Sequence, residues 1–245
     1  MKLIDALLSA LNLDIGVEDI RQGPFQTAVL TWNCGLAATL HEQEYHQDDA
    51  PVSDAGRLIG KDASELAQMA RSSNLFEAAI GMATINSLLN IDGQHCAAIN
   101  GGDLLAEKGK DKKVALVGHF PFVPKLRQAA KYLWVIERQS REGDVGESEA
   151  ETLIPQAEVV GITGSAFINH TIEHLLTLCN PKAYIVVLGA TAPLSPVLFD
   201  YGVDAISGTK VTDPEIVLRY VSQGATFRQI KGIQLLTMNR EGAQS

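Results

Sequence analysis

The second half of the sequence alternates short apolar segments with longer stretches that are compatible with helices. These β-rich segments occupy residues 112–118, 132–137, 158–164, 183–189 and 204–209. Near-continuous apolar strands that alternate with helices are typical of a parallel sheet that is covered on both faces. The pattern therefore predicts a doubly wound α/β fold, in which ligands bind beside the carboxyl ends of the strands.

The first half of the sequence lacks this alternation. It predicts a small antiparallel sheet that turns near Gly23 and Pro24, followed by helices over 63–71 and 75–89. Asn74 is expected to cap the second helix, with Glu77 as its reciprocal partner. Residues 101–113 are polar, charged and glycine-bearing, as in a linker. We therefore expect an α+β domain over 1–105 and an α/β domain over 106–245.

Composition excludes several classes of partner. The formal charge is -9, which opposes general binding to nucleic acid because phosphate contacts need clustered Lys and Arg. No apolar run reaches about 18 residues and no signal-peptide pattern is present, so we expect a cytoplasmic protein without a membrane partner. The cysteines at 34, 96 and 179 suit neither a disulfide framework nor a zinc ribbon. The sequence does not decide between a monomer and a homo-oligomer.

The predicted strand ends carry the candidate site residues. They are Gly118 and His119, Glu137 and Arg138, Thr163 to Ser165, Gly189 to Thr191, and Ser207 to Thr209. In Thr163-Gly164-Ser165, two hydroxyls flank a permissive glycine where a strand gives way to a helix, so backbone N–H groups can converge on an anion or a polar ligand. Ordinary turn chemistry, with Ser165 or Asn169 as the cap, explains the motif equally well.

A second motif, His170-Thr171-Ile172-Glu173-His174, matches an inverted zinc-protease pattern. On a helix, the apolar residues at 168, 172, 175, 176 and 179 form one stripe, and the two histidines fall on the other side. We expect the stripe to pack on the sheet and the histidines to face solvent, which makes the match accidental. Residues 41–49 hold two further histidines and several carboxylates, for which a charged surface loop is the commoner meaning.

Two other interpretations remain open. Glu137 follows Gly118 at the spacing of a ribose-binding acid in dinucleotide folds, but only one glycine is present and Phe120 stands where the pyrophosphate would approach. One alternative is thus an enzyme of the NAD or S-adenosylmethionine class, with Glu137 on the ribose and His119 as acid or base. The other is a metal carrier that uses His119, Glu137, and His41 or His46.

Five blocks of the sequence resemble a known family. They are FEAAIGMATINSLLN, VALVGHFPF, IERQSREGD, VVGITGSAFINHT and LGATAPLSPVLFDYGVDAISGTKVTDPE, in this order over nearly the whole chain. Together they are similar to the family named "Putative heavy-metal chelation". The resemblance implies an enolase-N-terminal-like domain followed by a Rossmann-like domain, with the active site in the cleft between them.

The resemblance also implies a set of site residues. They are Glu77, Gly81, Asn86, Gly118, His119, Phe120, Pro121, Glu137, Thr163, Ser165, Asn169, Thr171, Gly189, Thr191, Pro193 and Leu194, whereas His170 and His174 are outside the pattern. We expect His119 and Glu137 to be catalytic and Gly164 to join the ligand-binding residues.

This set favours a small polar, ring-bearing ligand. Apolar walls would come from Phe120, Pro121, Pro193 and Leu194, and orienting groups from Thr163, Ser165, Thr191 and Asn86. A soft heavy metal prefers thiolate and imidazole ligands, and the three cysteines lie outside the site blocks. An organic ligand or a metal chelate therefore fits the loops better than a bare heavy metal.

Overall fold

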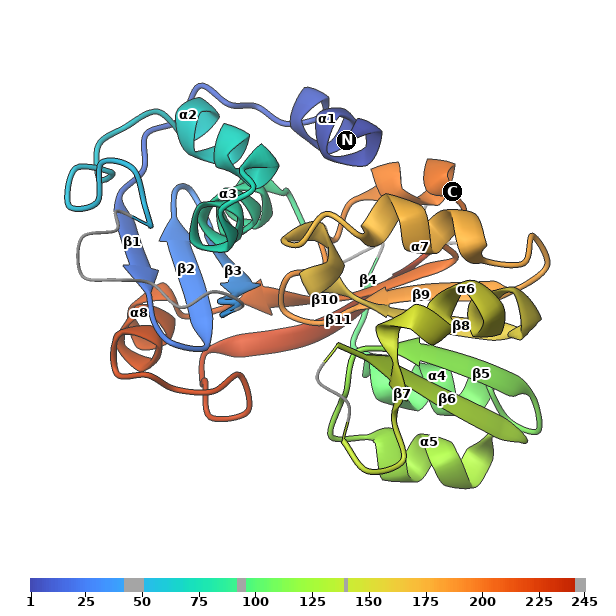
Figure 1. The fold of residues 1–245 in the computed structure, drawn as a ribbon. Coiled ribbons are helices and arrows are strands. Elements are labelled where there is room, and N and C mark those ends of the chain that lie inside the picture. The colour runs from blue at the N-terminus through green and yellow to red at the C-terminus, as the bar shows by residue number, and fades with distance from the viewer. Residues whose placement is uncertain (42–50, 92–95, 139–140, 241–245) are drawn as a thin grey trace.

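A computed structural model describes residues 1–41, 51–91, 96–138 and 141–240 (Figure 1). It contains a three-stranded antiparallel sheet and a mostly parallel sheet of eight strands. The expected fold class is thereby confirmed, because a small antiparallel part precedes a larger α/β part. None of the helices in these ranges combines the length and the hydropathy that a bilayer crossing requires.

The small sheet is a meander of β1 (Asp19–Gln22), β2 (Gln26–Leu30) and β3 (Cys34–Ala38). The predicted turn closes where the Gly23 N–H donates to the Gln26 carbonyl over 2.9 Å. The two predicted helices follow as α2 (Ala63–Gln68), continued by the 3₁₀ helix η1 (Met69–Arg71), and α3 (Leu75–Leu88). An added Cβ at Gly81 would lie 1.9 Å from the Ala70 nitrogen. Gly81 therefore lets α3 approach η1 closely.

All five predicted strands of the second half are present. They are β5 (Lys113–Val117), β6 (Tyr132–Glu137), β8 (Val159–Thr163), β9 (Tyr184–Leu188) and β10 (Ala205–Val211). Three further strands complete the sheet: β4 (Cys96–Ala97), β7 (Val145–Gly146) and β11 (Ile233–Asn239). The order is β4-β11-β10-β9-β8-β5-β6-β7, and β11 runs antiparallel to β10 and β4. The direction of strand addition reverses between β5 and β8, which defines the switch point of the sheet.

Helices cover both faces of the larger sheet. One face carries α4 (Gly101–Lys108) and α5 (Val123–Ala129), and the other carries α6 (Ala150–Leu153) and α7 (Ile172–Leu178) with the 3₁₀ helices η3 (Ile154–Gln156), η4 (Gly164–Phe167) and η5 (Pro196–Tyr201). The 3₁₀ helix η2 (Glu147–Glu149) precedes α6. Along β5, Val114 and Leu116 join one core cluster while Ala115 joins the other. Both faces of a strand are thus apolar, as its sequence predicts.

The expected linker over 101–113 is wrong. Residues 101–108 form α4, whose Leu104 and Leu105 are buried against the sheet. Asn100 caps this helix, because its side chain accepts a hydrogen bond from the Gly102 N–H over 2.8 Å. The helix is short and carries two glycines in its first turn, so its tertiary packing outweighs its low helical propensity. The expected division between residues 105 and 106 falls inside this helix.

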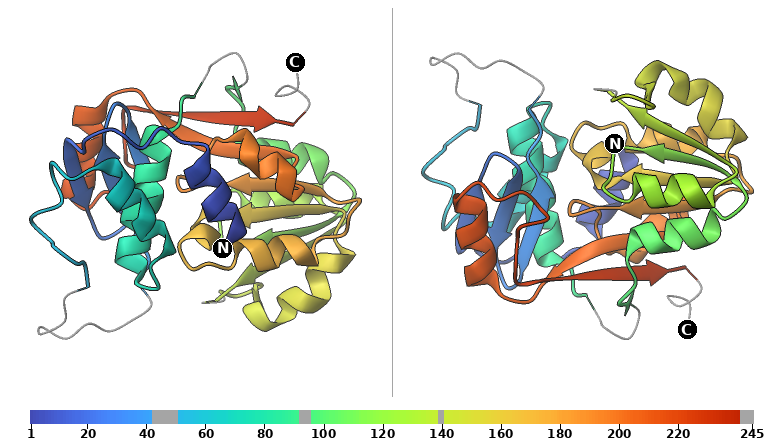
Figure 2. Two further views of the ribbon diagram at one scale, coloured as in Figure 1. Left: turned by 90° about the horizontal axis from the view of Figure 1, so that it is seen from above. Right: turned by 90° about the horizontal axis from the view of Figure 1, so that it is seen from below.

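Each part of the chain contributes one helix that packs against the other part. The N-terminal α1 (Lys2–Ser9) lies beside the larger sheet, where its Leu3 N–H donates to Glu173 over 2.9 Å (Figure 2). Conversely, α8 (Pro214–Ser222) of the second part packs on β1 and β2 of the small sheet through Val217 and Val221 (Figure 1). These contacts join the two parts of the chain at two separate places.

Candidate functional site

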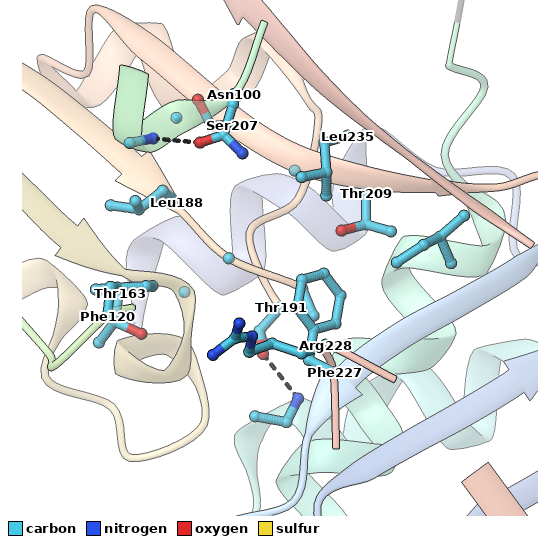
Figure 3. Close-up of a pocket in the computed structure, with 18 of the residues that line it drawn as sticks. Asn100, Phe120, Thr163, Leu188, Thr191, Ser207, Thr209, Phe227, Arg228 and Leu235 are labelled. Atoms are coloured by element: carbon cyan, nitrogen blue, oxygen red, sulfur yellow. Dashed lines mark hydrogen bonds between the residues drawn. The ribbon is translucent and has the colours of Figure 1, made fainter. Parts of the chain in front are cut away.

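A cavity of about 930 Å³ lies at the carboxyl ends of β8, β9 and β10, against the small sheet (Figure 3). Its apolar lining includes Phe120, Phe122, Leu188, Phe227, Ile230, Ile233 and Leu235, and its polar lining includes Gln26, Asn100, Thr163, Ser165, Thr191, Ser207, Thr209 and Arg228. This position is the one that a doubly wound sheet offers to a ligand. We call it the main cavity.

A smaller cavity of about 420 Å³ adjoins the main cavity. Phe120, Thr163 and Ser165 line both of them. The remaining lining of the smaller cavity includes Gly118, His119, Glu137, Asn169 and Thr171. Two neighbouring cavities with shared walls therefore lie at the switch point of the sheet, by the loops after β5 and β8.

The loop after β5 separates the two cavities. Gly118 has a φ of +100°, and an added Cβ would lie 3.0 Å from the Cβ of Thr163. A larger residue would be strained by this conformation and would push the loops after β5 and β8 apart. Next to it, the ring of Phe120 stacks on Phe122, with centroids 5.1 Å apart and an interplanar angle of 19°. Pro121 lines the main cavity beside this pair.

The loop after β8 combines capping with cavity lining. Thr163, and not Ser165 or Asn169, caps η4 by accepting a hydrogen bond from the Ser165 N–H over 3.3 Å. An added Cβ at Gly164 would lie only 2.4 Å from the Ala192 nitrogen, in the loop after β9. Asn169 accepts from the Thr171 hydroxyl over 2.8 Å, which fixes both side chains on the wall of the smaller cavity.

The loop after β9 is tied to the small sheet. Gly189 has a φ of +116°, and the Thr191 hydroxyl accepts a hydrogen bond from the Ala38 N–H over 2.9 Å. Asn86 donates to the carbonyls of Leu36, over 2.8 Å, and Thr191, over 3.2 Å. Thr191 lines the main cavity, whereas Asn86 lines neither cavity. The contacts that the structure shows for Asn86 hold the two parts of the chain together.

Three further expected residues lie outside both cavities. Pro193 and Leu194 are buried, and Leu194 packs in the core against Gly208. Glu77 accepts hydrogen bonds from the Ser53 N–H over 2.9 Å and the Ser72 hydroxyl over 2.6 Å. Burial by itself raises the pKa of Glu77, but these hydrogen bonds hold it below the usual value.

The expected capping pair at the start of α3 is half right. Asn74 accepts hydrogen bonds from the N–H groups of Phe76 and Glu77 and so caps the helix. The Asn74 N–H, however, donates to the Ser72 hydroxyl over 3.1 Å, and Ser72 in turn donates to Glu77. A serine therefore stands between the two members of the expected reciprocal pair.

An imidazole and two carboxylates meet at the smaller cavity. His119 Nδ1 lies 2.8 Å from Asp144 Oδ2, and the side chains of His119 and Asp144 are 22% and 1% exposed. The pKa of Glu137 is raised, first by burial and then by the charge of Asp144, while His119 and Arg141 partly offset the shift. Sequence reasoning missed Asp144, although it ends the block IERQSREGD that also contains Glu137.

The two histidines of the zinc-protease-like motif lie apart. His174 is exposed on α7 and pairs with Glu151 over 3.0 Å, as expected for a solvent-facing residue. The expectation for His170 is wrong, because this residue precedes the helix with a φ of +61°. Its Nε2 lies 2.8 Å from the Ser72 carbonyl, so His170 connects the two parts of the chain.

The described residues suit a bare soft metal poorly. Among them, no three histidine, cysteine or acidic side chains gather in a way that could hold an ion. Burial raises the pKa of the Cys34 and Cys179 thiols to about 12, which disfavours the thiolates that such a metal needs. The Nε2 of His41 lies 2.6 Å from the Pro24 carbonyl. His46, the other histidine of the metal-carrier hypothesis, lies outside the described residues.

The fold and the cleft define a two-part α/β protein whose candidate site lies at the switch point of its larger sheet. Two family models that share the description "Putative heavy-metal chelation" match residues 4–89 and 101–239, so the chain belongs to this family. The resemblance of the sequence blocks is thereby confirmed.

Relatives of the chain extend over most of its length. An uncharacterized protein of Methanocaldococcus jannaschii is 28% identical over 186 residues, which are 71% of this chain and 70% of the relative. A crystal structure of a family member of unknown function from Desulfitobacterium hafniense is 25% identical, with a TM-score of 0.83 over 97% of this chain and 98% of that one. One from Pyrococcus horikoshii, 22% identical, shares the fold with a TM-score of 0.80 over 97% and 99% of the two chains.

Proposed function

We propose that the chain binds a small ring-bearing organic ligand, free or as a metal complex, in the main cavity. The observation that carries this proposal is the cavity of about 930 Å³ at the carboxyl ends of β8, β9 and β10, between the two parts of the chain. Its volume is that of a typical small-molecule site, and mostly apolar walls with a few polar groups are the usual lining of such a site.

The walls of the main cavity favour a flat ligand. The stacked rings of Phe120 and Phe122 lie on one side, and Ile233 and Leu235 of β11 contribute aliphatic surface elsewhere in the lining. Aromatic rings favour offset stacking on another planar group. A ring of the ligand placed against this pair would bury apolar surface without any demand for polar partners.

Polar atoms on the same lining favour a ligand that carries a hydrogen-bond donor together with an acidic or carbonyl group. Gln26 Oε1 and Thr209 Oγ1 are buried and have no hydrogen-bond partner among the described residues. Arg228 lies on the loop after α8, and its side chain extends into the cavity in Figure 3. A buried polar atom without a partner destabilises the fold by about 1–3 kcal/mol, so a ligand that supplies the missing hydrogen bonds is favoured.

The same chemistry argues for a metal complex in preference to a free metal ion. Hydroxyl, amide and guanidinium groups on the cavity wall recognise the organic part of a chelate, and guanidinium cannot bind a cation. This choice agrees with the family description while it places the metal ligands on the bound molecule instead of the chain.

A pair of tryptophan substitutions on β11 tests the proposal. Leu235→Trp enlarges a side chain that lines the main cavity, whereas Gln234→Trp adds the same ring at the exposed neighbouring position outside the lining. Native mass spectrometry of untagged protein would measure the mass and occupancy of the ligand that co-purifies. We expect Leu235→Trp to lose the ligand and Gln234→Trp to retain it. Equal occupancy in both variants would contradict the proposal.

A further inference from the structure

The smaller cavity is lined by the His119 imidazole, whose orientation is fixed by the carboxylate of Asp144. The side chain of Asp144 is almost fully buried, and its Oδ2 lies 2.8 Å from His119 Nδ1 and accepts a hydrogen bond from the Arg141 N–H over 3.2 Å. A carboxylate on one ring nitrogen fixes the orientation of the ring and the tautomer of its neutral form. The other nitrogen, Nε2, has no hydrogen-bond partner among the described residues. It is the nitrogen of His119 that remains available to a bound molecule.

Glu137 lines the same cavity from the end of β6, the strand next to β5. Its Oε2 is buried and has no hydrogen-bond partner among the described residues. Burial and the charge of Asp144 raise the pKa of Glu137, although the His119 backbone N–H and the charges of His119 and Arg141 partly stabilise the carboxylate. The charged groups around it are His119, Asp144 and Arg141, and the ion pair of Arg138 and Glu147 and the titratable His41 line the same cavity.

A molecule in the main cavity can reach this pair of residues. Phe120, Thr163 and Ser165 line both cavities, so a ring held against Phe120 can carry a side arm past the two hydroxyls into the smaller cavity. The lining of the smaller cavity also includes Asn169, whose amide N–H groups suit a carbonyl or carboxylate on that arm.

We propose that Glu137 and His119 form a proton-transfer site for a carbonyl compound with an acidic hydrogen on the adjacent carbon, with Asp144 as the residue that positions His119. The inference rests on the proposed function, because the reacting molecule is the ligand of the cleft. Its reaction class is keto–enol tautomerisation, and it assigns a base, an acid and a positioning group to three neighbouring residues.

The proposed step balances within the site. The Glu137 carboxylate takes the proton from the carbon next to the carbonyl, and the electron pair of the broken C–H bond forms the C=C bond. The carbonyl π pair moves to oxygen, which receives the Nε2 proton of the His119 imidazolium. Glu137 ends protonated, His119 ends neutral and keeps its Nδ1 proton in the hydrogen bond to Asp144, and the enol is released. The reverse step returns both protons, so no oxidant, reductant or co-substrate is needed.

Phenylpyruvate is a suitable probe, because it joins an aromatic ring to an acidic C–H group beside a carbonyl. In deuterated buffer, proton NMR measures the exchange of its C3 hydrogens, and calorimetry measures its binding separately. We expect the protein to accelerate exchange and both Glu137→Gln and His119→Ala to slow it about a hundredfold while they retain binding. Glu151→Gln and His174→Ala, which change an exposed ion pair on α6 and α7, should exchange at the unchanged rate.

Asp144→Asn tests the positioning role. The exchange rate of the protein should fall as the pH decreases through the pKa of Glu137, which lies above the ordinary 4.5. Because the charge of Asp144 helps to raise that pKa, Asp144→Asn should both slow exchange and move this acidic limb to lower pH. A role in folding alone would leave the position of the limb unchanged.

The outcomes separate this inference from the proposed function. If phenylpyruvate binds but exchanges no faster than in buffer, or exchanges equally fast with Glu137→Gln and His119→Ala, the proton-transfer site is refuted and the binding cleft stands. If phenylpyruvate does not bind, or binds equally well to Leu235→Trp, both the cleft and the reaction assigned to it are refuted for this class of ligand.

Discussion

Replacement of Gly164 by alanine probes the contact that shapes the cleft. The added Cβ would lie 2.4 Å from the Ala192 nitrogen, whereas real Cβ contacts essentially never fall below 3.0 Å. The loops after β8 and β9 must therefore separate by about 0.6 Å, the difference between these distances, and both are backbone segments that cannot rotate away. Overpacking of this kind costs about 1–3 kcal/mol. We expect Gly164→Ala to lower the free energy of unfolding by that amount and to weaken ligand binding.

Gly16→Ala is the matched control. An added Cβ at Gly16 meets nothing within 4 Å, so the variant should be neutral or more stable by up to about 1 kcal/mol. Urea unfolding at one pH, with equal m-values for the variants, measures both changes. If Gly164→Ala unfolds at the same urea concentration as Gly16→Ala, the close approach of the two loops is refuted, and with it the shape of the main cavity.

Three further predictions concern single residues and cofactors. Glu137 has a raised pKa, so its ionisation destabilises the fold as the pH rises above 4.5. Glu137→Gln should therefore flatten the pH dependence of urea unfolding and change the free energy of unfolding at pH 7 by less than about 1 kcal/mol. A larger decrease in the free energy of unfolding would contradict this prediction. His170→Ala should lower the free energy of unfolding by about 1 kcal/mol, because the hydrogen bond to the Ser72 carbonyl is lost. His174→Ala should lower it by less than about 0.5 kcal/mol. Elemental analysis should find an unchanged metal content in both variants. Calorimetry with oxidised and reduced dinucleotides and with S-adenosylmethionine should show no binding at millimolar concentration, because the loop after β5 has one glycine of the dinucleotide-binding signature and carries the bulky Phe120. Binding that Glu137→Gln abolishes would favour the nucleotide alternative.

The larger sheet was readable from the sequence because its strands are buried on both faces. Such strands are continuous apolar runs, as in YIVVL of β9, and the last residue of each run marks the carboxyl end of the strand. The loops after β5, β8 and β9 could therefore be named in advance. Gly118, Phe120, Thr163 and Ser165, which follow β5 and β8, all line the smaller cavity.

Other features were hidden because tertiary contacts decide them. The sequence of α4 is polar and glycine-bearing, and only the burial of two adjacent leucines distinguishes it from a linker. Asp144 lies beyond the end of β6 in an irregular segment, so no periodicity directs it toward His119. Asn86 was expected to orient a ligand, but its partners are the carbonyls of Leu36 and Thr191, which are 50 and 105 positions away. Long-range pairing of this kind has no local signal.

The most direct test of the binding cleft is the position of a bound molecule. Amide chemical-shift mapping with phenylpyruvate would follow the backbone of the whole chain at once. We predict that the largest shifts fall on residues 118–120, 163–165 and 189–191, at the carboxyl ends of β5, β8 and β9. Shifts that gather on α7 around His174, with these three loops unchanged, would contradict the central claim.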